Sequence, residues 1–230
     1  YRGAGTIEFL VDKYRHFYFL EMNTRLQVEH PITEEVVGVD LVKEQLHVAG
    51  GEALRFKQED LFQRGHAIEC RICAEDTENG FIPCPGIIRQ LTEPNGIGVR
   101  IDSYVYEGYE IPLYYDPMIG KLIVWATNRQ FAIERMRRVL YEFKITGLKT
   151  NISYLRRIMY APAFVKGEYD TSFLSKYSRS LQRSNGENEE IENMAMIAAY
   201  VDYLFNLEEN SPVRTTDSRP ISRWREFGLQ

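Results

Sequence analysis

The stretch FLEMNTRLQVEHP, residues 19–31, carries an unusual order of polar side chains. In a β-strand, every second side chain lies on the same face. One face would then carry a carboxylate, an amide, a guanidinium, an amide and a carboxylate: Glu21, Asn23, Arg25, Gln27 and Glu29. A straight row of this kind would span roughly 26 Å, which is too long for one small ligand. The stretch therefore predicts either a bend after Asn23 or two neighbouring sites.

A second strand precedes this stretch. Residues 5–11 (GTIEFLV) and 17–23 (FYFLEMN) flank the sequence DKYRH, which indicates a hairpin. A loop over residues 13–16 would place Glu8 opposite Glu21. Two carboxylates facing each other across a ladder repel, unless a divalent cation lies between them and Asn23 adds a third oxygen ligand. The alternative is a register shifted by one residue, in which Glu8 faces solvent.

The second half of the row suits an anion. The guanidinium fork of Arg25 matches a planar, carboxylate-like anion, and the carboxylate of Glu29 could act as a general base beside it. The plain alternative is a solvated strand face with a surface Arg–Glu pair, which contributes little to stability. Spacing alone leaves both interpretations open.

Composition is that of an ordinary globular chain. The 230 residues are 44% apolar and 27% charged, and the net charge of −5 gives no electrostatic case for nucleic acid. No apolar run approaches the length that spans a bilayer. Cys70 and Cys73 form a C-x-x-C, but a metal site would need a second pair. We expect these two thiols and Cys84 to be reduced, in a cytoplasmic protein.

Strand and helix patterns alternate along the rest of the chain. Alternating or turn-bounded strands occur over residues 66–76, 86–91, 98–105, 110–116 and 118–126. Helices are predicted from Asp40 to Gly50, after Asn128 and from Thr150. A polar linker, a helix over residues 191–207 and an extended tail follow. The pattern predicts an α+β fold with mostly antiparallel strands, in units of residues 1–63, 64–178 and 179–230.

Six segments, in this order, resemble biotin carboxylase, the ATP-grasp component of biotin-dependent carboxylases. They are GTIEFL, FLEMNTRLQVEHPITE, GHAIECRICAED, PGIIRQL, PLYYDPMIGKL and GLKTN. The resemblance runs from residue 3 to about residue 178, and EMNTRLQVEH is its most specific part. It implies the C-terminal half of an ATP-grasp domain (an antiparallel sheet with helices) in residues 1–63. The biotin carboxylase C-terminal domain would follow in residues 64–178.

The chain begins YRGAGTIEFL, without Met. We expect it to be the back part of a longer polypeptide, because a terminus rarely lies at the edge of a core strand. In the family that it resembles, the glycine-rich lid and the phosphate-binding lysines would precede Tyr1. We therefore expect this piece alone to be inactive and not to hydrolyse ATP.

The resemblance also implies roles for single residues. Glu8, Glu21 and Asn23 match the positions that hold two Mg²⁺ or Mn²⁺ ions on ATP. Leu10 matches a position near the adenine, so that ATP binding would involve Glu8, Leu10 and Glu21.

Bicarbonate and biotin have matching positions too. Arg71, in ECRICAED, matches the arginine near the ureido oxygen of biotin. The bicarbonate-binding positions and the proposed base are matched by Arg25, Gln27, Val28 (through its backbone) and Glu29. The implied reaction is ATP-dependent carboxylation of biotin by bicarbonate through carboxyphosphate.

The implied partners are a biotin carboxyl carrier protein or domain, a carboxyltransferase subunit, the missing N-terminal half of the chain and a second copy. Arg100 matches a region near the family's dimer contact. The tail with Trp224 and Arg225 resembles the end of acyl-CoA carboxylase α-type subunits. It favours an acetyl-CoA or propionyl-CoA carboxylase.

Three alternatives stay open. The chain could belong to a pyruvate carboxylase, or to another ATP-grasp ligase, although such a ligase should lack RLQVEH and the segment around Arg71. It could also be a non-catalytic module for dimerisation or carrier docking.

Overall fold

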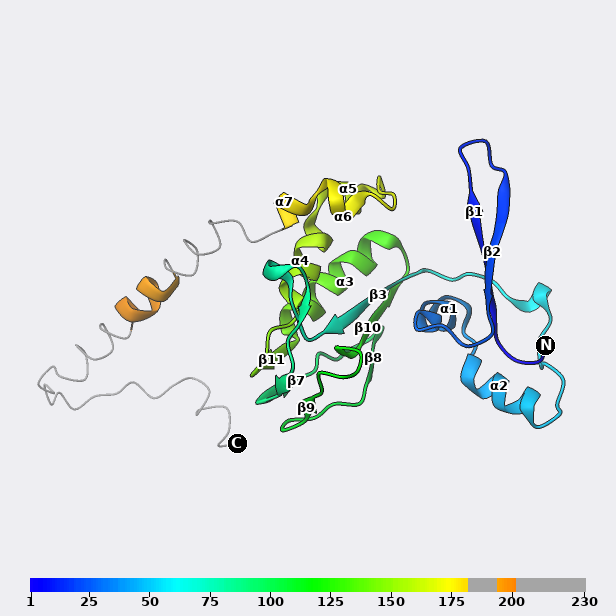
Figure 1. The fold of residues 1–230 in the computed structure, drawn as a ribbon, viewed down its shortest axis with the longest axis horizontal. Coiled ribbons are helices and arrows are strands. Elements are labelled where there is room, and N and C mark those ends of the chain that lie inside the picture. The colour runs from blue at the N-terminus through cyan, green and yellow to red at the C-terminus, as the bar shows by residue number, and fades with distance from the viewer. Residues whose placement is uncertain (182–193, 202–230) are drawn as a thin grey trace, which may run out of the picture. The chain divides into compact units, whose positions relative to one another are not determined.

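The computed structural model describes residues 1–181 and 194–201. The chain divides into two units, Tyr1–Gln182 and Arg183–Gln230, and every helix and strand labelled below lies in the first (Figure 1). In the second unit, residues 194–201 are helical, inside the helix predicted over residues 191–207. The rest of that helix, the predicted linker, and the tail with Trp224 and Arg225 lie outside the described residues.

Strands β1 (Thr6–Val11) and β2 (Phe17–Asn23) form the predicted antiparallel hairpin (Figure 1). Its outermost pair is Val11 with Phe17, so the loop runs over residues 12–16 and the predicted loop over residues 13–16 was wrong by one residue. Apolar side chains lie exposed on both faces of the hairpin, among them Leu10 at 60% and Phe19 at 65% exposure.

The predicted pairing of Glu8 with Glu21 is nevertheless confirmed. The register shifts between Glu8 and Phe9, because Phe9 pairs with Phe19 and leaves Leu20 as an extra residue on β2. This bulge compensates for the longer loop, so the two carboxylates still face each other.

Two helices follow the hairpin. α1 (His30–Val37) was not predicted, because the alternating polar row favours a strand as far as Glu29. Pro31 lies in its first turn, where a fixed φ suits a helix start, and Gly38 ends it in the left-handed conformation at φ 78°. α2 (Leu41–Ala49) begins and ends as predicted, with the Asp40 side chain accepting a hydrogen bond from the amide of Lys43.

A three-stranded antiparallel sheet forms the core, in the order β3–β10–β8. Strands β3 (His66–Cys73), β8 (Val99–Ser103) and β10 (Met118–Ala126) lie within the predicted strand segments. α3 (Arg129–Glu142) is capped by Asn128 as predicted and contacts β3 and β10. α4 (Ile152–Tyr160) contacts β3 and α3.

The sheet has one apolar and one charged face, because side chains alternate along each strand. The apolar face supplies fully buried side chains such as Ile72 and Leu122 to a core shared with α3 and α4. The charged face carries Arg71, Lys121 and Asp102 in one cross-strand row. α1 contacts β3 and β10 and lies across the sheet from α3 (Figure 1). The charged face is therefore the one that meets the segment after the hairpin.

Short elements complete the first unit: η1 (Gln58–Asp60), β4 (Glu75–Asp76), η2 (Thr77–Asn79), β5 (Ile82–Pro83), β6 (Gly86–Ile87), β7 (Gln90–Thr92), β9 (Glu110–Ile111), β11 (Lys144–Thr146), α5 (Pro162–Lys166), α6 (Phe173–Lys176) and α7 (Ser178–Leu181). Every strand pairing in the described residues is antiparallel, and the predicted α+β class is confirmed. The predicted unit boundaries at residues 63 and 178 stay predictions. Within residues 1–181 and 194–201, no helix is long and apolar enough to cross a membrane.

Candidate active site

The inner end of the hairpin gathers carboxylate and amide groups. The Asn23 Nδ2 atom donates to Glu8 Oε1 at 2.7 Å and lies 3.5 Å from Glu21 Oε1. Gln27 Nε2 donates to the same Glu8 oxygen at 3.2 Å. The row predicted from the sequence is thus folded back on itself, and a residue of its second half touches the carboxylate cluster of the first.

The chain bends after Asn23, as one of the two sequence interpretations required. β2 ends at Asn23, and the residues that follow form a turn into α1. Within this turn, the amide of His30 donates to the carbonyl of Gln27 at 3.2 Å. The backbone therefore presents Gln27, Val28 and Glu29 at the start of a helix rather than along a strand.

Glu29 meets Arg71 of β3. The Arg71 NH2 group donates to Glu29 Oε2 at 2.7 Å, and both side chains are about half exposed, at 51% and 52%. An ion pair this exposed contributes little to stability. Its importance is that it brings the predicted base and the predicted biotin-facing arginine within hydrogen-bond distance of each other.

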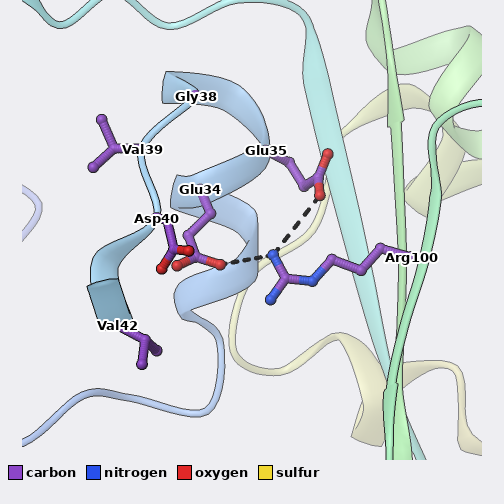
Figure 2. Close-up of a pocket in the computed structure, with 7 residues that line it drawn as sticks. All are labelled: Glu34, Glu35, Gly38, Val39, Asp40, Val42 and Arg100. Atoms are coloured by element: carbon purple, nitrogen blue, oxygen red, sulfur yellow. Dashed lines mark hydrogen bonds and ion pairs between the residues drawn. The ribbon is translucent and has the colours of Figure 1, made fainter. Parts of the chain in front are cut away.

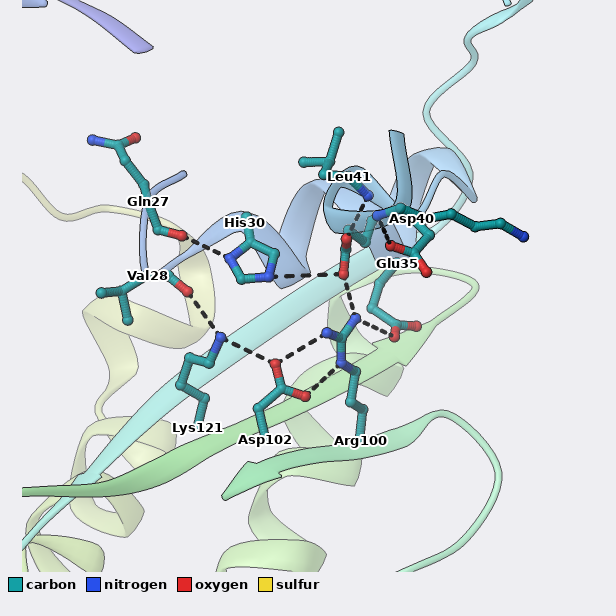
Figure 3. Close-up of polar contacts among 11 residues, drawn as sticks. Gln27, Val28, His30, Glu35, Asp40, Leu41, Arg100, Asp102 and Lys121 are labelled. Carbon is teal, nitrogen blue, oxygen red and sulfur yellow. Dashed lines mark hydrogen bonds and ion pairs between the residues drawn. The ribbon is translucent and has the colours of Figure 1, made fainter. Parts of the chain in front are cut away.

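A ring of polar contacts, made by side chains of α1 and of the sheet, fixes the backbone of the turn (Figure 3). His30 Nδ1 lies 2.7 Å from the carbonyl oxygen of Gln27. Lys121 Nζ donates to the carbonyl of Val28 at 3.2 Å and forms an ion pair with Asp102 at 3.0 Å. The carbonyls of Gln27 and Val28 are thus anchored, the first by His30 of α1 and the second by Lys121 of the sheet.

The ring closes through Arg100. Its guanidinium donates twice to Asp102, at 2.7 and 3.0 Å, and once to Glu34 of α1 at 2.6 Å (Figure 3). Burial raises the pKa of Asp102, but the hydrogen bonds from Arg100 and Lys121 outweigh it and hold that pKa below its usual value. The hydrogen bond to Asp102 in turn raises the pKa of Arg100.

Arg100 also contacts a third carboxylate, that of Glu35 at 3.8 Å, beside a pocket of about 550 Å³ (Figure 2). Its lining residues are Glu34, Glu35, Gly38, Val39, Asp40, Val42 and Arg100. In this pocket, the carboxylates of Glu34 and Glu35 converge on the guanidinium of Arg100, so their charge is already compensated.

Beside the Glu29–Arg71 pair lies a cavity of about 460 Å³. Strand β3 contributes the largest part of its lining, including Glu69 and Arg71, and α4 and α5 add apolar side chains such as Leu155 and Phe164. The Glu69 Oε2 atom is buried and has no hydrogen-bond partner. Burial raises the pKa of Glu69, against the nearby charges of Lys121 and Arg71, which lower it.

This environment predicts that Glu69→Gln stabilises the protein. The pKa of the Glu69 carboxyl is raised in the folded state above its ordinary value of 4.5. The free energy of unfolding therefore falls as the pH rises from 4.5 through the raised pKa. Removing the charge should therefore add about 1 kcal/mol, or about 2–4 °C in Tm, above the raised pKa. Thermal unfolding at pH 4 and pH 8 checks this, because the gain should shrink at pH 4, where Glu69 is protonated.

The matched control is Glu134→Gln, because Glu134 is exposed on α3 and should show no such pH-dependent gain. A lower Tm for Glu69→Gln at pH 8 would contradict the prediction. It would mean that attraction to Lys121 outweighs the cost of burial.

Asn151 secures the backbone of β3 at Arg71. Its Nδ2 donates to the carbonyl of Arg71 at 3.0 Å, and its Oδ1 accepts from the amide of Cys73 at 3.0 Å. The sequence predicted a helix start at Thr150, but α4 begins at Ile152 and Asn151 makes no side-chain cap. The buried amide is used on β3 instead, where it imitates a neighbouring strand.

The other predicted residues have fewer contacts. Arg25 is exposed and donates to the carbonyl of Leu26 at 3.3 Å. The thiols of Cys70 and Cys73 are free, and burial raises both pKa values to about 12. Within the described part of the chain, no three His, Cys, Asp or Glu side chains are placed to hold a metal ion. The hairpin offers two carboxylates and one amide, and Leu10 lies on its exposed surface.

Sequence reasoning missed four residues of this region: Glu69, Asp102, Lys121 and Asn151. One signal was available for Lys121, which is the single charged residue of the strand MIGKLIVWA. A lone lysine in an otherwise apolar strand indicates a specific partner, because burying an unpaired ammonium is costly.

Comparisons with known proteins match two parts of this chain. Residues 69–176 match the family model "Biotin carboxylase C-terminal domain". Residues 1–57 match the family model "Carbamoyl-phosphate synthase L chain, ATP binding domain". The ring around the turn therefore joins the two matched regions.

Two curated relatives are similar over most of the chain. A biotin carboxylase of Nostoc sp. is 56% identical over 179 residues, which is 78% of this chain and 40% of the relative. A pyruvate carboxylase subunit of Methanothermobacter thermautotrophicus is 58% identical over 181 residues, which is 79% of this chain and 37% of the relative. The chain thus spans about two fifths of the length of these relatives.

A solved structure agrees with this. The biotin carboxylase domain dimer of Hydrogenobacter thermophilus 2-oxoglutarate carboxylase, in complex with MgADP, ADP and bicarbonate, matches with a TM-score of 0.77 and 45% identity. The match covers 80% of this chain and 40% of that one. Family models, relatives and fold lead to one conclusion: the chain belongs to the biotin carboxylase family.

Proposed function

We propose that this chain carries the bicarbonate-facing and biotin-facing part of an active site that carboxylates biotin. In the proposed reaction, bicarbonate and ATP give carboxyphosphate, and carboxyphosphate supplies the CO₂ that biotin takes up. The observation that carries the proposal is the 2.7 Å contact between Glu29, after the hairpin, and Arg71, in the C-terminal domain. It brings a carboxylate, the proposed general base, beside a guanidinium, the proposed oxyanion-stabilising cation.

The proposed roles follow from charge and position. Arg25 and Gln27, with the backbone of Val28, would bind bicarbonate, and the Glu29 carboxylate would take its proton. Arg71 would hold the developing oxyanion of biotin by charge-assisted hydrogen bonds. Positioning and electrostatic stabilisation account for most of the catalysis in a phosphoryl transfer of this kind.

Glu8, Glu21 and Asn23 would hold Mg²⁺ or Mn²⁺, with Leu10 near the adenine of ATP. The donor set fits, because two opposed carboxylates and an amide oxygen are ligands that these ions accept. The metal would neutralise phosphate charge. The contact from Gln27 to Glu8, at 3.2 Å, supports two adjacent sites, one for the ATP phosphates and one for bicarbonate.

The proposed partners are a biotin carrier protein or domain, a carboxyltransferase subunit, a second copy, and further sequence of the same polypeptide. Exposed apolar side chains on both faces of the hairpin support the last of these, because an isolated two-stranded hairpin is marginally stable. A cytoplasmic location is part of the proposal and rests on the composition of the sequence.

The acceptor is proposed from the tail, which favours an acetyl-CoA or propionyl-CoA carboxylase. Pyruvate carboxylase is the alternative, and the Methanothermobacter relative is part of one. The domain matched by residues 1–57 bears the name of a carbamoyl-phosphate enzyme, but the C-terminal domain match argues against another ATP-grasp ligase.

The test is phosphate release by the parent polypeptide, meaning this sequence together with the rest of a biotin carboxylase. With ATP and Mg²⁺, fast release should require both bicarbonate and free biotin, and bicarbonate without biotin should support only a slow release. Arg71→Ala should lower the biotin-stimulated rate by about 10²-fold, while the slow bicarbonate-dependent rate persists. The 230-residue chain alone should release no phosphate.

Each alternative has its own outcome in this assay. Turnover supported by an amine or another carboxylate, with no effect of biotin, would identify another ATP-grasp ligase. A parent polypeptide that binds its carrier but never releases phosphate would identify a non-catalytic module.

A further inference from the structure

The turn that carries the proposed bicarbonate site is fixed at two successive peptide planes. Gln27 contributes the carbonyl of the first plane, which accepts from the backbone amide of His30 and lies against its ring. Val28 contributes the carbonyl of the second, which accepts from Lys121. In a trans peptide the N–H and C=O groups point in opposite directions. Anchoring both carbonyls therefore sets the direction of the amides of Val28 and Glu29.

Lys121 reaches this turn from the sheet. Its side chain is only 12% exposed, and its ammonium contacts the Val28 carbonyl at 3.2 Å and Asp102 at 3.0 Å. On β10 it pairs with Arg71 of β3. Like charges directly opposite each other in a ladder are destabilising, so fold stability alone does not explain this arrangement.

Anions around the two cations balance their charge. Arg71 is paired with Glu29, Lys121 is paired with Asp102, and the carboxylate of Glu69 lies close enough to interact with both cations. A buried ion pair often contributes nothing net to stability, because desolvation offsets the attraction. What the Lys121–Asp102 pair does provide is a rigid donor at one backbone carbonyl, 93 residues away in sequence.

We propose that Lys121 is a positioning residue for bicarbonate, acting through the Val28 carbonyl to fix the peptide plane that joins Val28 to Glu29. This inference rests on the proposed function. Asp102 and Arg100 extend the anchor to Glu34 of α1, so the helix that follows the turn is tied to the same side chains. Lys121 itself touches neither reactant; it sets the geometry of groups that do.

The test compares Lys121→Met with Lys149→Met in the parent polypeptide. Lys149 also pairs with an aspartate, Asp76, at 2.5 Å, but outside the ring around the turn. Loss of the Lys121 hydrogen bond should raise the KM for bicarbonate about tenfold, as expected for one charge-assisted bond. The KM for ATP should stay at the wild-type value. Lys149→Met should leave both constants unchanged.

A purely structural role for Lys121 would lower the Tm and the fraction of active enzyme without separating the two KM values. Such a result, or an unchanged KM for bicarbonate in a folded Lys121→Met protein, overturns the proposal. Should Lys121→Met fail to fold, Lys121→Arg keeps the charge beside Asp102. Its KM for bicarbonate should then rise by a smaller factor at an unchanged Tm, and an unchanged KM again overturns the proposal.

Failure of the proposed function can be distinguished from failure of the Lys121 proposal, because it would appear in the wild-type protein. If the unmodified parent polypeptide shows no bicarbonate-dependent phosphate release, the proposed function is wrong. If it does, and the lysine variants behave alike, only the role of Lys121 is wrong.

Discussion

Replacing Glu29 by glutamine is expected to slow bicarbonate-dependent phosphate release by the parent polypeptide by about 10²–10⁴-fold, the usual contribution of a general base. Glutamine keeps the size and one oxygen of the side chain but takes up no proton at neutral pH. The loss should appear in kcat at saturating bicarbonate. Steady-state phosphate release with and without bicarbonate measures it.

Stability should hardly change in the same variant. Glu29 and Arg71 are both about half exposed, and such pairs contribute at most about 1 kcal/mol. A Tm within a few degrees of wild type therefore accompanies the predicted loss of activity. Glu134→Gln, on the exposed surface of α3, is the matched control for the amide substitution.

Two results would contradict the role of Glu29 as base. One is a Glu29→Gln protein that retains kcat within a factor of about 3, far below the range for a lost general base. The other is a raised KM for bicarbonate at an unchanged kcat, which would make Glu29 a binding group only. Neither result would contradict the proposed metal site at the carboxylate cluster of the hairpin.

The hairpin shows how much of a strand pairing a local sequence pattern can predict. Alternation and the position of the turn residues led to the pairing of Glu8 with Glu21, but the loop is one residue longer than predicted. The extra residue at Leu20 restored the register. A bulge of this kind has no reliable sequence signal, so the correct pairing came from two compensating features, neither of which the sequence pattern predicted.

The end of β2 was decided by tertiary structure. Five alternating polar residues favoured a long strand, yet the strand stops at Asn23 and α1 begins at His30. Pro31 was the local signal for a helix start, since proline suits the first turn. The contacts that fix the turn come from Lys121 and Arg71, which lie far along the chain, and no spacing within residues 19–31 encodes them.

The meeting of Glu29 with Arg71 joins residues 42 positions apart. No spacing argument predicts it; the resemblance to biotin carboxylase is what pointed to both residues. For Asn151, the resemblance pointed to no role. Its segment GLKTN is one of the six that resemble biotin carboxylase, but the pattern of the segment predicts only a helix start. Its buried amide binds β3 because the outer edge of that strand needs partners for its backbone groups.

Asn151→Ala is therefore expected to destabilise the chain strongly. Asn151 is 8% exposed, and its side chain satisfies the Arg71 carbonyl and the Cys73 amide at 3.0 Å each. Alanine would leave both groups without this partner inside the protein. The cost is about 2–4 kcal/mol, which corresponds to a Tm lower by about 5–10 °C. Thermal unfolding of the 230-residue chain measures it.

The size of the side chain and its hydrogen bonds can be separated. Asn151→Asp keeps the shape and the acceptor for Cys73 but turns a carboxylate oxygen toward the Arg71 carbonyl, so it should not restore stability. Asn79→Ala removes an exposed amide with a single partner, Asp76, and should cost about 1 kcal/mol or less.

Hydrogen exchange locates the effect. If Asn151 acts as a substitute strand, the amide of Cys73 should exchange faster in Asn151→Ala, while amides at the other end of β3 keep their protection. Uniformly faster exchange along β3 would instead mean that the whole strand is loosened, and the specific contact to Arg71 and Cys73 would not be what Asn151 provides. Because Arg71 projects from the same short segment, a local loss at Cys73 should also lower biotin stimulation in the parent polypeptide without altering its KM for ATP.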